Sequence, residues 1–403
     1  MFLDTALRPP SDRRVSHSAL RLIWSPLAAL GLGYAGWGAE STMLALALLF
    51  PAVWSRACSH GHAWLIAIAY FAMVTRGIPG GAAVFFGETA PSGAGWVLWM
   101  TFNAVLALPW GWLWSPHLVA HYPAAWWRTS LAMVLLILPP LGLFGFGHPL
   151  TAAGVLFPSL GWFGLCLTWL LLPFHQSPAR LILLLLLIGS AFARPVTPLR
   201  DERWRALDTA YPRLQTTSPD FMEDFARQQE LRRQAAQLDA PFLVMPEGVA
   251  GRWSPIAAGG WAPFERYLTS RGQTLLMGAE IPQASGSYLN AIVVLGRHAQ
   301  APLPQRVPVP ISMWQPWHAG GAQANWFASG VAQFGTTRVA YLICYEQFIL
   351  GPMLVSFAQG PEVIMAIAND WWARETPIPG QQRAIMAAWS ALFGLPLVQS
   401  VNQ

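Results

Sequence analysis

The stretch RVAYLICYEQF, residues 338–348, places a cysteine directly after a short apolar run. Such a run predicts a buried strand, and Cys344 stands where that strand ends. A thiol in this position is either a nucleophile or a small apolar residue that fills a core. On this stretch alone the core interpretation is favoured, because free cysteines are among the most buried residues. The rest of the chain has to decide between the two.

The composition is that of a membrane protein. The chain has 403 residues, of which 54% are hydrophobic and only 11% are charged, whereas soluble domains are roughly 25% charged. Its 22 tryptophans fall mostly near the ends of apolar segments, which is typical of bilayer interfaces. All 24 basic residues are arginines, so a mechanism that needs a lysine is excluded in its usual form. The arginines are spread thinly, and we do not expect direct binding of nucleic acid.

The first half of the chain contains seven apolar segments that predict membrane-spanning helices. They cover residues 19–38, 41–55, 62–75, 95–114, 130–147, 152–173 and 179–193. Several are shorter than the roughly 20 residues that a perpendicular helix needs, so the second and third could instead form one re-entrant pair. The predicted organisation is a cytoplasmic tail over 1–18, a transmembrane domain of about seven helices over 19–193, and a second domain over 194–403.

The positions of the arginines predict the orientation, because short cytoplasmic loops accumulate positive charge. Four arginines come before or within the start of the first segment, and three more lie in alternate loops: Arg8, Arg13, Arg14, Arg21, Arg56, Arg128 and Arg180. Arg76 and Arg194 are exceptions to this pattern. With the amino terminus inside, an odd number of spans places the second domain in the periplasm. We therefore expect a multi-pass protein of a bacterial inner membrane.

Beyond residue 194 the composition becomes that of a soluble α/β domain. Two helices are expected, one that begins at Ser218 and Pro219 and runs to about Leu238, and one over 381–394. The short apolar stretches that predict buried strands are PFLVMPEG (241–248), QTLLMGAEI (273–281), NAIVVLG (290–296), RVAYLICY (338–345), EVIMAIAND (362–370) and PLVQSVN (396–402). Helices interleaved with short strands favour a layered α/β architecture.

Two of these strands end in reactive side chains, Glu247 and Cys344. A carboxylate at one strand end and a thiol at another is an arrangement suited to covalent acyl transfer. In such chemistry the acid serves as general base and the thiol as nucleophile.

The segments around these two residues resemble motifs of the nitrilase superfamily, and within it most resemble apolipoprotein N-acyltransferase. The matching segments are VMPEG, SYLNAIVVLG, ICYE, ANDWW and QRAIMAAWSALFGLPLVQSVN, which follow that family's order at similar spacing. The resemblance covers the whole chain loosely and residues 241–402 specifically. It implies a four-layer αββα sandwich, a Cys-Glu-Lys site and a thioester intermediate from which an acyl group passes to an amine. It implies no cofactor and no metal.

Carried over by this resemblance, Cys344 becomes the nucleophile and Glu247 the base. The backbone N–H of Tyr345 would donate to the oxyanion that forms on attack. Glu346 either orients its neighbours or is simply a hydrogen-bonded acid. Asn369, with Asp370 after it, ends a strand and could line the pocket, although turn formation explains this pair equally well.

The chain departs from the family where its lysine is expected. That lysine falls on Gln305, and a trailing acid falls on Met313. Loss of a cation beside the thiol should raise the pKa of the thiol and weaken stabilisation of an oxyanion. Arg306 could supply the charge, but adjacent residues of an extended segment face opposite sides, so this requires a register shift of one residue. The alternative for Arg306 is a contact with the surface or a phospholipid headgroup.

The end of the chain also differs from the acyltransferase. The family's last strands and closing transmembrane helix would follow Asn402, so the sandwich is expected to lack edge strands. RVPVPISMW (306–314) and the final SVNQ resemble conjugal-transfer proteins encoded by conjugative plasmids. The sequence thus predicts a nitrilase-like protein of plasmid conjugation, with a membrane lipid or lipoprotein-like acyl substrate and other conjugal-transfer proteins as possible partners. Alternatives are an inactive scaffold of the conjugation machinery and a lipoprotein N-acyltransferase.

Other candidate sites are not favoured. Cys58 and Cys166 lie in or beside apolar segments and are interpreted as packing residues, and an odd cysteine count argues against a disulfide framework. The glycine-rich stretch GIPGGAAVFFG (77–87) lacks the lysine of a phosphate-binding loop. Histidines in the first half are expected at membrane-loop positions, where interfacial packing is favoured over metal ligation.

Overall fold

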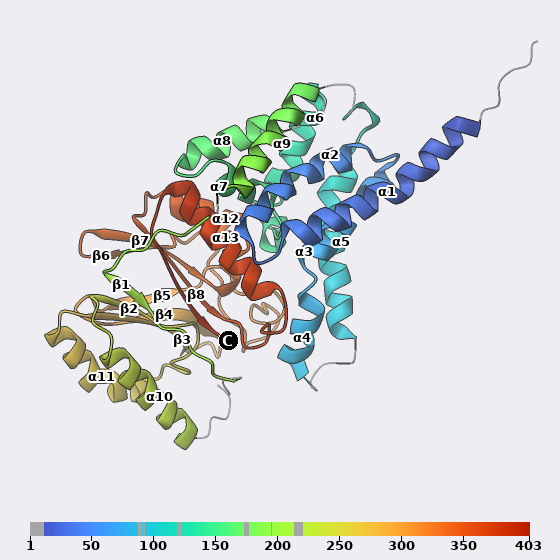
Figure 1. Ribbon diagram of the computed structural model, residues 1–403. Coiled ribbons are helices and arrows are strands. Elements are labelled where there is room, and N and C mark those ends of the chain that lie inside the picture. The colour runs from blue at the N-terminus through green and yellow to red at the C-terminus, as the bar shows by residue number, and fades with distance from the viewer. Residues whose placement is uncertain are drawn as a thin grey trace, which may run out of the picture.

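The computed structural model describes residues 12–87, 91, 93–118, 122–172, 177–194, 196–212 and 221–403. Its N-terminal part is helical, its C-terminal part is an α/β domain, and the two pack against each other (Figure 1). This division agrees with the change of composition near residue 194.

The helical region consists of short helices joined by tight turns. In chain order these are α1 (Asp12–Gly36), α2 (Phe50–Ser55), α3 (His60–Val74), α4 (Ile78–Phe86), α5 (Ala94–Leu113), α6 (Tyr122–Leu135), α7 (Ala153–Leu156), α8 (Gly161–Leu171) and α9 (Pro178–Phe192). Single-turn or longer 3₁₀ helices lie between them, among them η1 (Ser41–Leu49), η4 (Leu141–Phe144) and η5 (Pro149–Ala152). Proline occupies the first turn of α2, α4 and α9, where its missing N–H is not needed.

The predicted apolar segments coincide with these helices, but two of them are divided. The segment 130–147 holds the end of α6 and then η4, because Pro139 and Pro140 interrupt the helix. The segment 152–173 holds α7 and α8, with Pro158 between them.

Within the described residues, α5 is the one helix that is both long and apolar enough to cross a bilayer by itself. The pair α3 and α4, bent by 55° at a short break, would make a second span if taken together. The bundle of about seven spans stays a prediction.

Aromatic side chains form the centre of the helical region. Trp37, Trp54 and Trp110 are almost completely buried there, so these three tryptophans are core residues and not interfacial anchors. Trp37 donates a hydrogen bond of 2.8 Å to the hydroxyl of Tyr70, and Trp54 donates one of 2.8 Å to the carbonyl of Trp110. The ring nitrogens of Trp37 and Trp54 therefore find partners inside the protein, which removes the usual reason for these two tryptophans to remain at the surface.

Two sheets form the α/β domain. The first has the order β1 (Trp204–Ala206), β2 (Phe242–Val244), β3 (Thr274–Pro282), β4 (Tyr288–Gly296) and β5 (Gln300–Pro304). The second has the order β6 (Val331–Phe334), β7 (Thr337–Ile343), β8 (Val363–Asn369) and β9 (Leu397–Asn402). Strands β1 to β3 are parallel in the first sheet and β7 to β9 in the second, with antiparallel strands completing each.

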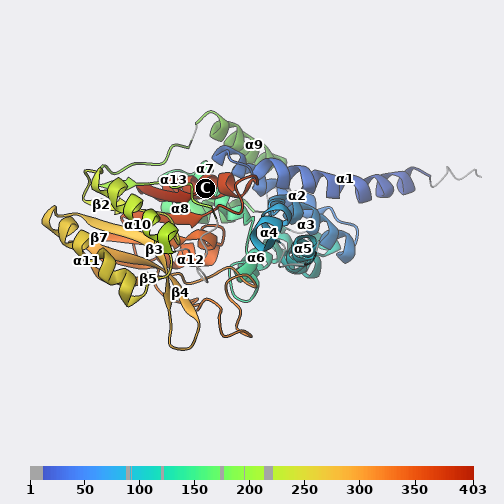
Figure 2. The same cartoon turned by 90° about the horizontal axis from the view of Figure 1, so that it is seen from below.

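The two sheets pack face to face and are covered by helices on their outer faces (Figures 1 and 2). Successive side chains of β3 point to opposite faces of the sheet. Leu276 joins the core between the two sheets, whereas Leu275 and Met277 face the outer helices. Those helices are α10 (Phe221–Ala236) and α11 (Pro255–Ser270). On the second sheet the covering helices are α12 (Leu350–Phe357) and α13 (Ile378–Phe393). The layers are therefore α, β, β and α.

The helical region lies against α13. A Cβ at Gly154 of α7 would collide with the carbonyl of Ala388, so glycine permits the close contact between the two parts. The side chain of Gln381 donates hydrogen bonds of 2.8 Å to the carbonyls of both Trp37 and Val74. The α/β domain and the helical region therefore share one continuous core.

All six predicted strands are present. The sequence interpretation missed β1, β5, β6, α11 and α12, which are short, or half-exposed, or contain glycine and proline. The predicted helix start at Ser218 and Pro219 lies outside the described residues, and α10 is described from Phe221.

Candidate functional site

Glu247 and Cys344 come together from different sheets. Strand β2 ends at Val244, and Glu247 lies three residues further on, in the loop that continues beside β3. Strand β7 ends at Ile343, directly before Cys344. The side chains of Cys344 and Glu247 line the same cavity, and each shifts the pKa of the other. The structure thus brings together the two residues that the sequence singled out.

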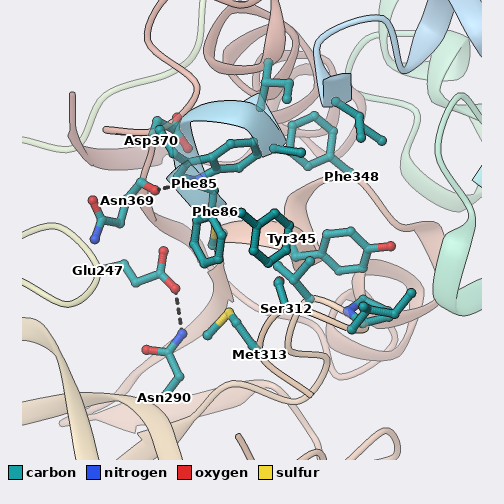
Figure 3. A pocket seen from close by; sticks show the side chains of 18 of the residues that line it. Phe85, Phe86, Glu247, Asn290, Ser312, Met313, Tyr345, Phe348, Asn369 and Asp370 are labelled. Atoms are coloured by element: carbon teal, nitrogen blue, oxygen red, sulfur yellow. Dashed lines mark hydrogen bonds between the residues drawn. The ribbon is translucent and has the colours of Figure 1, made fainter. Parts of the chain in front are cut away.

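Two glycines make room for Glu247. A Cβ at Gly278 of β3 would collide with the backbone of Glu247, so only glycine lets the strand approach this closely. Gly248 has a φ of +72° and turns the chain away after the acid. The carboxylate then accepts a 2.6 Å hydrogen bond from the amide of Asn290 (Figure 3).

Cys344 begins a single 3₁₀ turn, Cys344–Gln347, and has a φ of +50°. This left-handed conformation is costly for a residue with a Cβ, and strained residues of this kind occur preferentially at functional sites. The amide of Gln382 on α13 fixes the turn by donating a 3.1 Å hydrogen bond to the carbonyl of Cys344. A strand that ends in a strained turn presents its side chain at the end of the sheet, as a nucleophile requires.

Burial controls the protonation of both groups. Removal from water raises the pKa of Glu247 to about 7, although the hydrogen bond from Asn290 and the nearby thiol of Cys344 oppose the shift. Burial also raises the pKa of the Cys344 thiol well above its usual value, and the negative charges of Glu247 and Asp370 add to the effect. Near neutral pH the thiol is therefore protonated, while a substantial part of Glu247 is an available carboxylate.

The position expected to hold a lysine is part of the site's polar network. The side-chain oxygen of Gln305 accepts a 2.8 Å hydrogen bond from Asn290, and its nitrogen donates one of 2.9 Å to the carbonyl of Ile343. Gln305 therefore links the residue beside Glu247 to the residue before Cys344, without a charge. Asn290 was not singled out from the sequence, although it lies in the SYLNAIVVLG segment that carried part of the resemblance.

Arg306 faces the other way. Its side chain is completely buried, its Nη1 donates to the carbonyl of Pro352 at 3.1 Å and to the hydroxyl of Ser356 at 3.0 Å, and its Nε lies 3.4 Å from a carboxylate oxygen of Glu346. It is not among the residues that line the pocket described below. The alternation of an extended segment holds, no register shift occurs, and the structure brings Arg306 neither to the pocket nor to the surface.

Glu346 orients its neighbours from this buried position. Its carboxylate accepts hydrogen bonds from the backbone N–H groups of Arg306 at 2.6 Å, Val307 at 3.1 Å and Ile343 at 3.0 Å. It thereby ties the turn that holds Cys344 to the segment that holds Gln305. We refer to Arg306, Glu346 and Ser356 as the elbow cluster.

Tyr345 and Asn369 both line the pocket. The hydroxyl of Tyr345 donates a 2.6 Å hydrogen bond to the carbonyl of Leu143 in the helical region. The side-chain oxygen of Asn369 accepts a hydrogen bond from Asn402 at 2.8 Å, while its backbone acts to lower the pKa of both Glu247 and Cys344. Asn369 therefore meets the site through its main chain.

A cavity of about 300 Å³ opens beside Cys344 and Glu247. Its walls come from both parts of the chain, as Figure 3 shows for Phe85, Phe86 and Phe348. The helical region contributes Ile78, Ala82, Phe85, Phe86, Leu98, Phe102, Phe144 and Phe146. The stretch 77–87, which the sequence had only excluded as a phosphate loop, thus forms much of one wall. Its run of apolar residues between two glycines was the only signal.

The polar part of the lining is acidic. Glu247, Glu280 and Asp370 all line the cavity, and no arginine or histidine is among the described residues that do. Met313 lines it where the family's second acid was expected. We refer to Glu247, Cys344 and Asp370 as the pocket cluster. The described residues contain no group of three His, Cys, Asp or Glu side chains that could hold a metal ion.

Solved structures show a limited likeness to this chain. An amidase from Nesterenkonia sp. is 14% identical and has a TM-score of 0.36, covering 51% of this chain and 78% of its own. A mutant of the Nesterenkonia AN1 amidase, described as a member of the nitrilase superfamily, is 14% identical with a TM-score of 0.35 over the same shares.

Curated relatives match almost the whole chain. The conjugal transfer protein TraB of Agrobacterium fabrum is 34% identical over 409 residues, covering 96% of this chain and 94% of the relative. The probable conjugal transfer protein TraB of Sinorhizobium fredii is 33% identical, covering 96% of this chain and all of the relative. No family model matches the chain. The resemblance to plasmid conjugal-transfer proteins is confirmed by these relatives, and the chain belongs to the TraB family of conjugal transfer proteins.

Proposed function

We propose that this chain is an enzyme of the bacterial cell envelope that serves plasmid conjugation by thioester chemistry at Cys344, either acyl transfer or amide cleavage. The observation that carries the proposal is that the Cys344 thiol and the Glu247 carboxylate line the same cavity, close enough for each to shift the pKa of the other. A core cysteine would not need a strained backbone, a carboxylate partner and an opening.

In the proposed reaction the sulfur of Cys344 attacks a carbonyl carbon of the substrate, and Glu247 accepts the thiol proton. The tetrahedral intermediate collapses when its bond to the leaving alcohol or amine breaks, and Glu247 returns the proton to that group. A thioester remains. An acceptor, which is an amine in acyl transfer and water in hydrolysis, then attacks the thioester and gives a proton to Glu247, which passes it to the departing sulfur.

Stabilisation of the oxyanion is assigned to the turn that follows the nucleophile. The first N–H groups of a helical turn are left unused by its own hydrogen bonds, so that of Tyr345 is available beside Cys344. The hydrogen bonds of Gln305 to Asn290 and to the carbonyl of Ile343 connect the residue beside the base to the residue before the turn. None of the described residues that line the cavity is basic, so stabilisation of the oxyanion is expected to be weaker than in a site with a lysine.

We further propose that the helical region lies in the inner membrane, with residues 1–18 cytoplasmic, 19–193 spanning and 194–403 periplasmic. Large apolar side chains are exposed along several of its helices, more than a soluble surface tolerates. On α5 and α9 they are Trp96, Val97, Met100, Leu108, Trp112, Ile182, Leu183, Leu185, Leu186 and Phe192. A membrane lipid or lipoprotein-like acyl substrate would then reach the apolar cavity from the bilayer.

The test combines chemistry with biology. We expect intact-protein mass spectrometry of the detergent-solubilised chain to detect an acyl mass on Cys344 that hydroxylamine removes. Cys344→Ala and Cys344→Ser should abolish both this adduct and plasmid transfer, whereas the matched variant Cys58→Ser should keep both. Unimpaired transfer by the two Cys344 variants would refute an enzymatic role.

A second candidate function is a scaffold that kept the fold and lost turnover. It is favoured by one observation, the raised pKa of a thiol surrounded by carboxylates with no lining cation. A scaffold predicts that Cys344→Ala supports normal transfer and that no acyl adduct forms under any condition.

A further inference from the structure

Asp370 is a buried acid without a hydrogen-bond partner. It follows Asn369 at the end of β8, and its backbone is fixed by a bond of 2.7 Å from its N–H to the carbonyl of Asn402 and one of 2.8 Å from the N–H of Ala373 to its own carbonyl. Its side chain lies at the cavity (Figure 3) and is only 1% exposed. Neither carboxylate oxygen has a hydrogen-bond partner among the described residues.

This arrangement is unusual, because a buried carboxylate without partners loses its hydration and gains nothing in return. The other two buried acids near the turn are satisfied: Asn290 donates to Glu247, and three backbone N–H groups donate to Glu346. Arg383 on α13 attracts the charge of Asp370 without removing the shift that burial causes. Glu247 acts in the opposite direction, since its own negative charge opposes ionisation of Asp370.

The surroundings of Asp370 favour a positively charged ligand. Three carboxyl groups line the cavity, and none of the described lining residues is basic. An anion entering it would be repelled by all three, whereas a cation would be attracted by all three in a medium of low polarity. The walls add aromatic faces, among them Phe85 and Trp371, whose ring centroids lie 6.1 Å apart, and such faces attract organic cations.

We propose that Asp370 binds a primary ammonium group of the substrate, so that the substrate itself supplies a positive charge beside Cys344, where none of the described lining residues supplies one. The ammonium donates hydrogen bonds to the two oxygens that now have none. Its apolar remainder lies against the aromatic walls. This assignment rests on the proposed function for its biological meaning, but the binding site stands on the geometry of Asp370 and the cavity alone.

A bound ammonium would change the chemistry of the thiol. The negative charges of Glu247 and Asp370 contribute to the raised pKa of Cys344, and a cation on Asp370 opposes both. Lowering that pKa by one unit increases the thiolate fraction about tenfold while the thiol is mostly protonated. The empty site is therefore unreactive, and the occupied site is activated.

The experiment measures thiol reactivity in the full-length protein in detergent, with Cys58→Ser and Cys166→Ser so that Cys344 is the only thiol. The rate of modification by methyl methanethiosulfonate is followed against pH with hexylammonium, with neutral hexanol, and with neither. We expect hexylammonium to increase the rate at pH 8 by about tenfold. Hexanol, which matches the apolar part, should leave it unchanged or lower.

The variants locate the effect. Asp370→Asn keeps the shape of the side chain and removes its charge, so hexylammonium should no longer stimulate the reaction. Asp239→Asn removes a charge from a side chain that is 96% exposed, and stimulation should persist. Gln305→Lys places a fixed cation in the chain, so Cys344 should react faster without amine and gain little from it.

Stimulation equal to that of hexanol, or stimulation that survives Asp370→Asn, would overturn the assignment. Hexyltrimethylammonium, which cannot donate hydrogen bonds, should stimulate less than hexylammonium; equal stimulation would also overturn a primary-ammonium site. If stimulation is found and requires Asp370 but no acyl adduct ever forms on Cys344, the proposed function fails while this inference holds. If an acyl adduct forms on Cys344 but hexylammonium does not stimulate its modification, the proposed function holds and this inference fails.

Discussion

The elbow cluster and the pocket cluster meet at the turn Cys344–Gln347, to which they contribute Glu346 and Cys344, yet the two clusters differ in how they compensate buried charge. In the elbow cluster Glu346 has a guanidinium and three backbone donors. In the pocket cluster the carboxylate of Glu247 accepts one hydrogen bond from the amide of Asn290, and no described residue donates a hydrogen bond to the side chain of Asp370. The guanidinium of Arg306 is therefore a cation near the site, but it pairs with Glu346 and does not line the cavity. An acid left unsatisfied beside a thiol and a cavity is better explained by a ligand than by folding.

The largest effect is expected from breaking the elbow cluster. Arg306→Met removes the cation opposite Glu346 while keeping much of the side-chain volume. Removing one partner of a buried ion pair leaves the other uncompensated, so we expect a loss of about 3–5 kcal/mol in the free energy of unfolding. Urea unfolding in detergent measures it. The surface variant Arg233→Met, which loses an exposed ion pair with Glu230, should shift the midpoint far less; equal shifts would remove the distinction between the two sites.

Asp370→Asn should increase the free energy of unfolding, whereas Arg306→Met should decrease it. Burial raises the pKa of Asp370 to about 7, so the folded chain holds this proton more tightly than the unfolded chain does. The stability that this provides is complete below the pKa of the unfolded chain and is lost as the pH rises through about 7. We expect the variant to match the parent near pH 4 and to be more stable by about 1–3 kcal/mol at pH 8. Unfolding at both values checks this, and a variant that is less stable at pH 8 would contradict it.

Glu247→Gln should separate reactivity from catalysis. The carboxylate raises the pKa of the neighbouring thiol, so its removal should increase modification of Cys344 by methyl methanethiosulfonate at pH 8 by about 3–10-fold. Formation of the acyl adduct should be lost at the same time, because no base remains. Both are read by mass spectrometry on the same sample. Slower modification in the variant would indicate that Glu247 assists ionisation of the free thiol.

The smallest effect is expected from Ser356→Ala. It removes one hydroxyl that accepts a 3.0 Å hydrogen bond from Arg306, while the ion pair with Glu346 and the bond to Pro352 remain. We expect a loss of about 1 kcal/mol in unfolding free energy. Reactivity of Cys344 should not change, since the elbow cluster does not line the cavity. A changed rate would show that the two clusters are coupled.

The strands of the α/β domain could be predicted because each is a short apolar run with turn residues around it, and β7 and β8 are almost wholly buried. The meeting of Cys344 and Glu247 could be predicted from strand ends together with a family resemblance. The direction of Arg306 was open, since alternation along an extended segment favoured one side and a register shift of one residue would have turned it to the other. The structure settles it because Glu346 holds the N–H groups of both Arg306 and Val307.

The cavity walls could not be predicted. Phe85 and Phe86 are separated from Cys344 by about 260 residues of chain, and nothing in a short apolar helix indicates which distant surface it covers. The unsatisfied state of Asp370 was equally hidden. An Asn-Asp pair after a strand has the composition of an ordinary turn, and only the three-dimensional surroundings show which of its oxygens lack partners.

The division of the cavity between the two halves of the chain has a consequence for how relatives diverge. Exchange of α4 and α5 between two TraB proteins would carry part of the cavity wall with it, while Cys344, Glu247 and Asp370 stayed behind. Such chimaeras should inherit the preference for ligand shape from the donor of the helices and the preference for ligand charge from the donor of the sandwich. Shape and charge selectivity are thus separately transferable traits in this architecture.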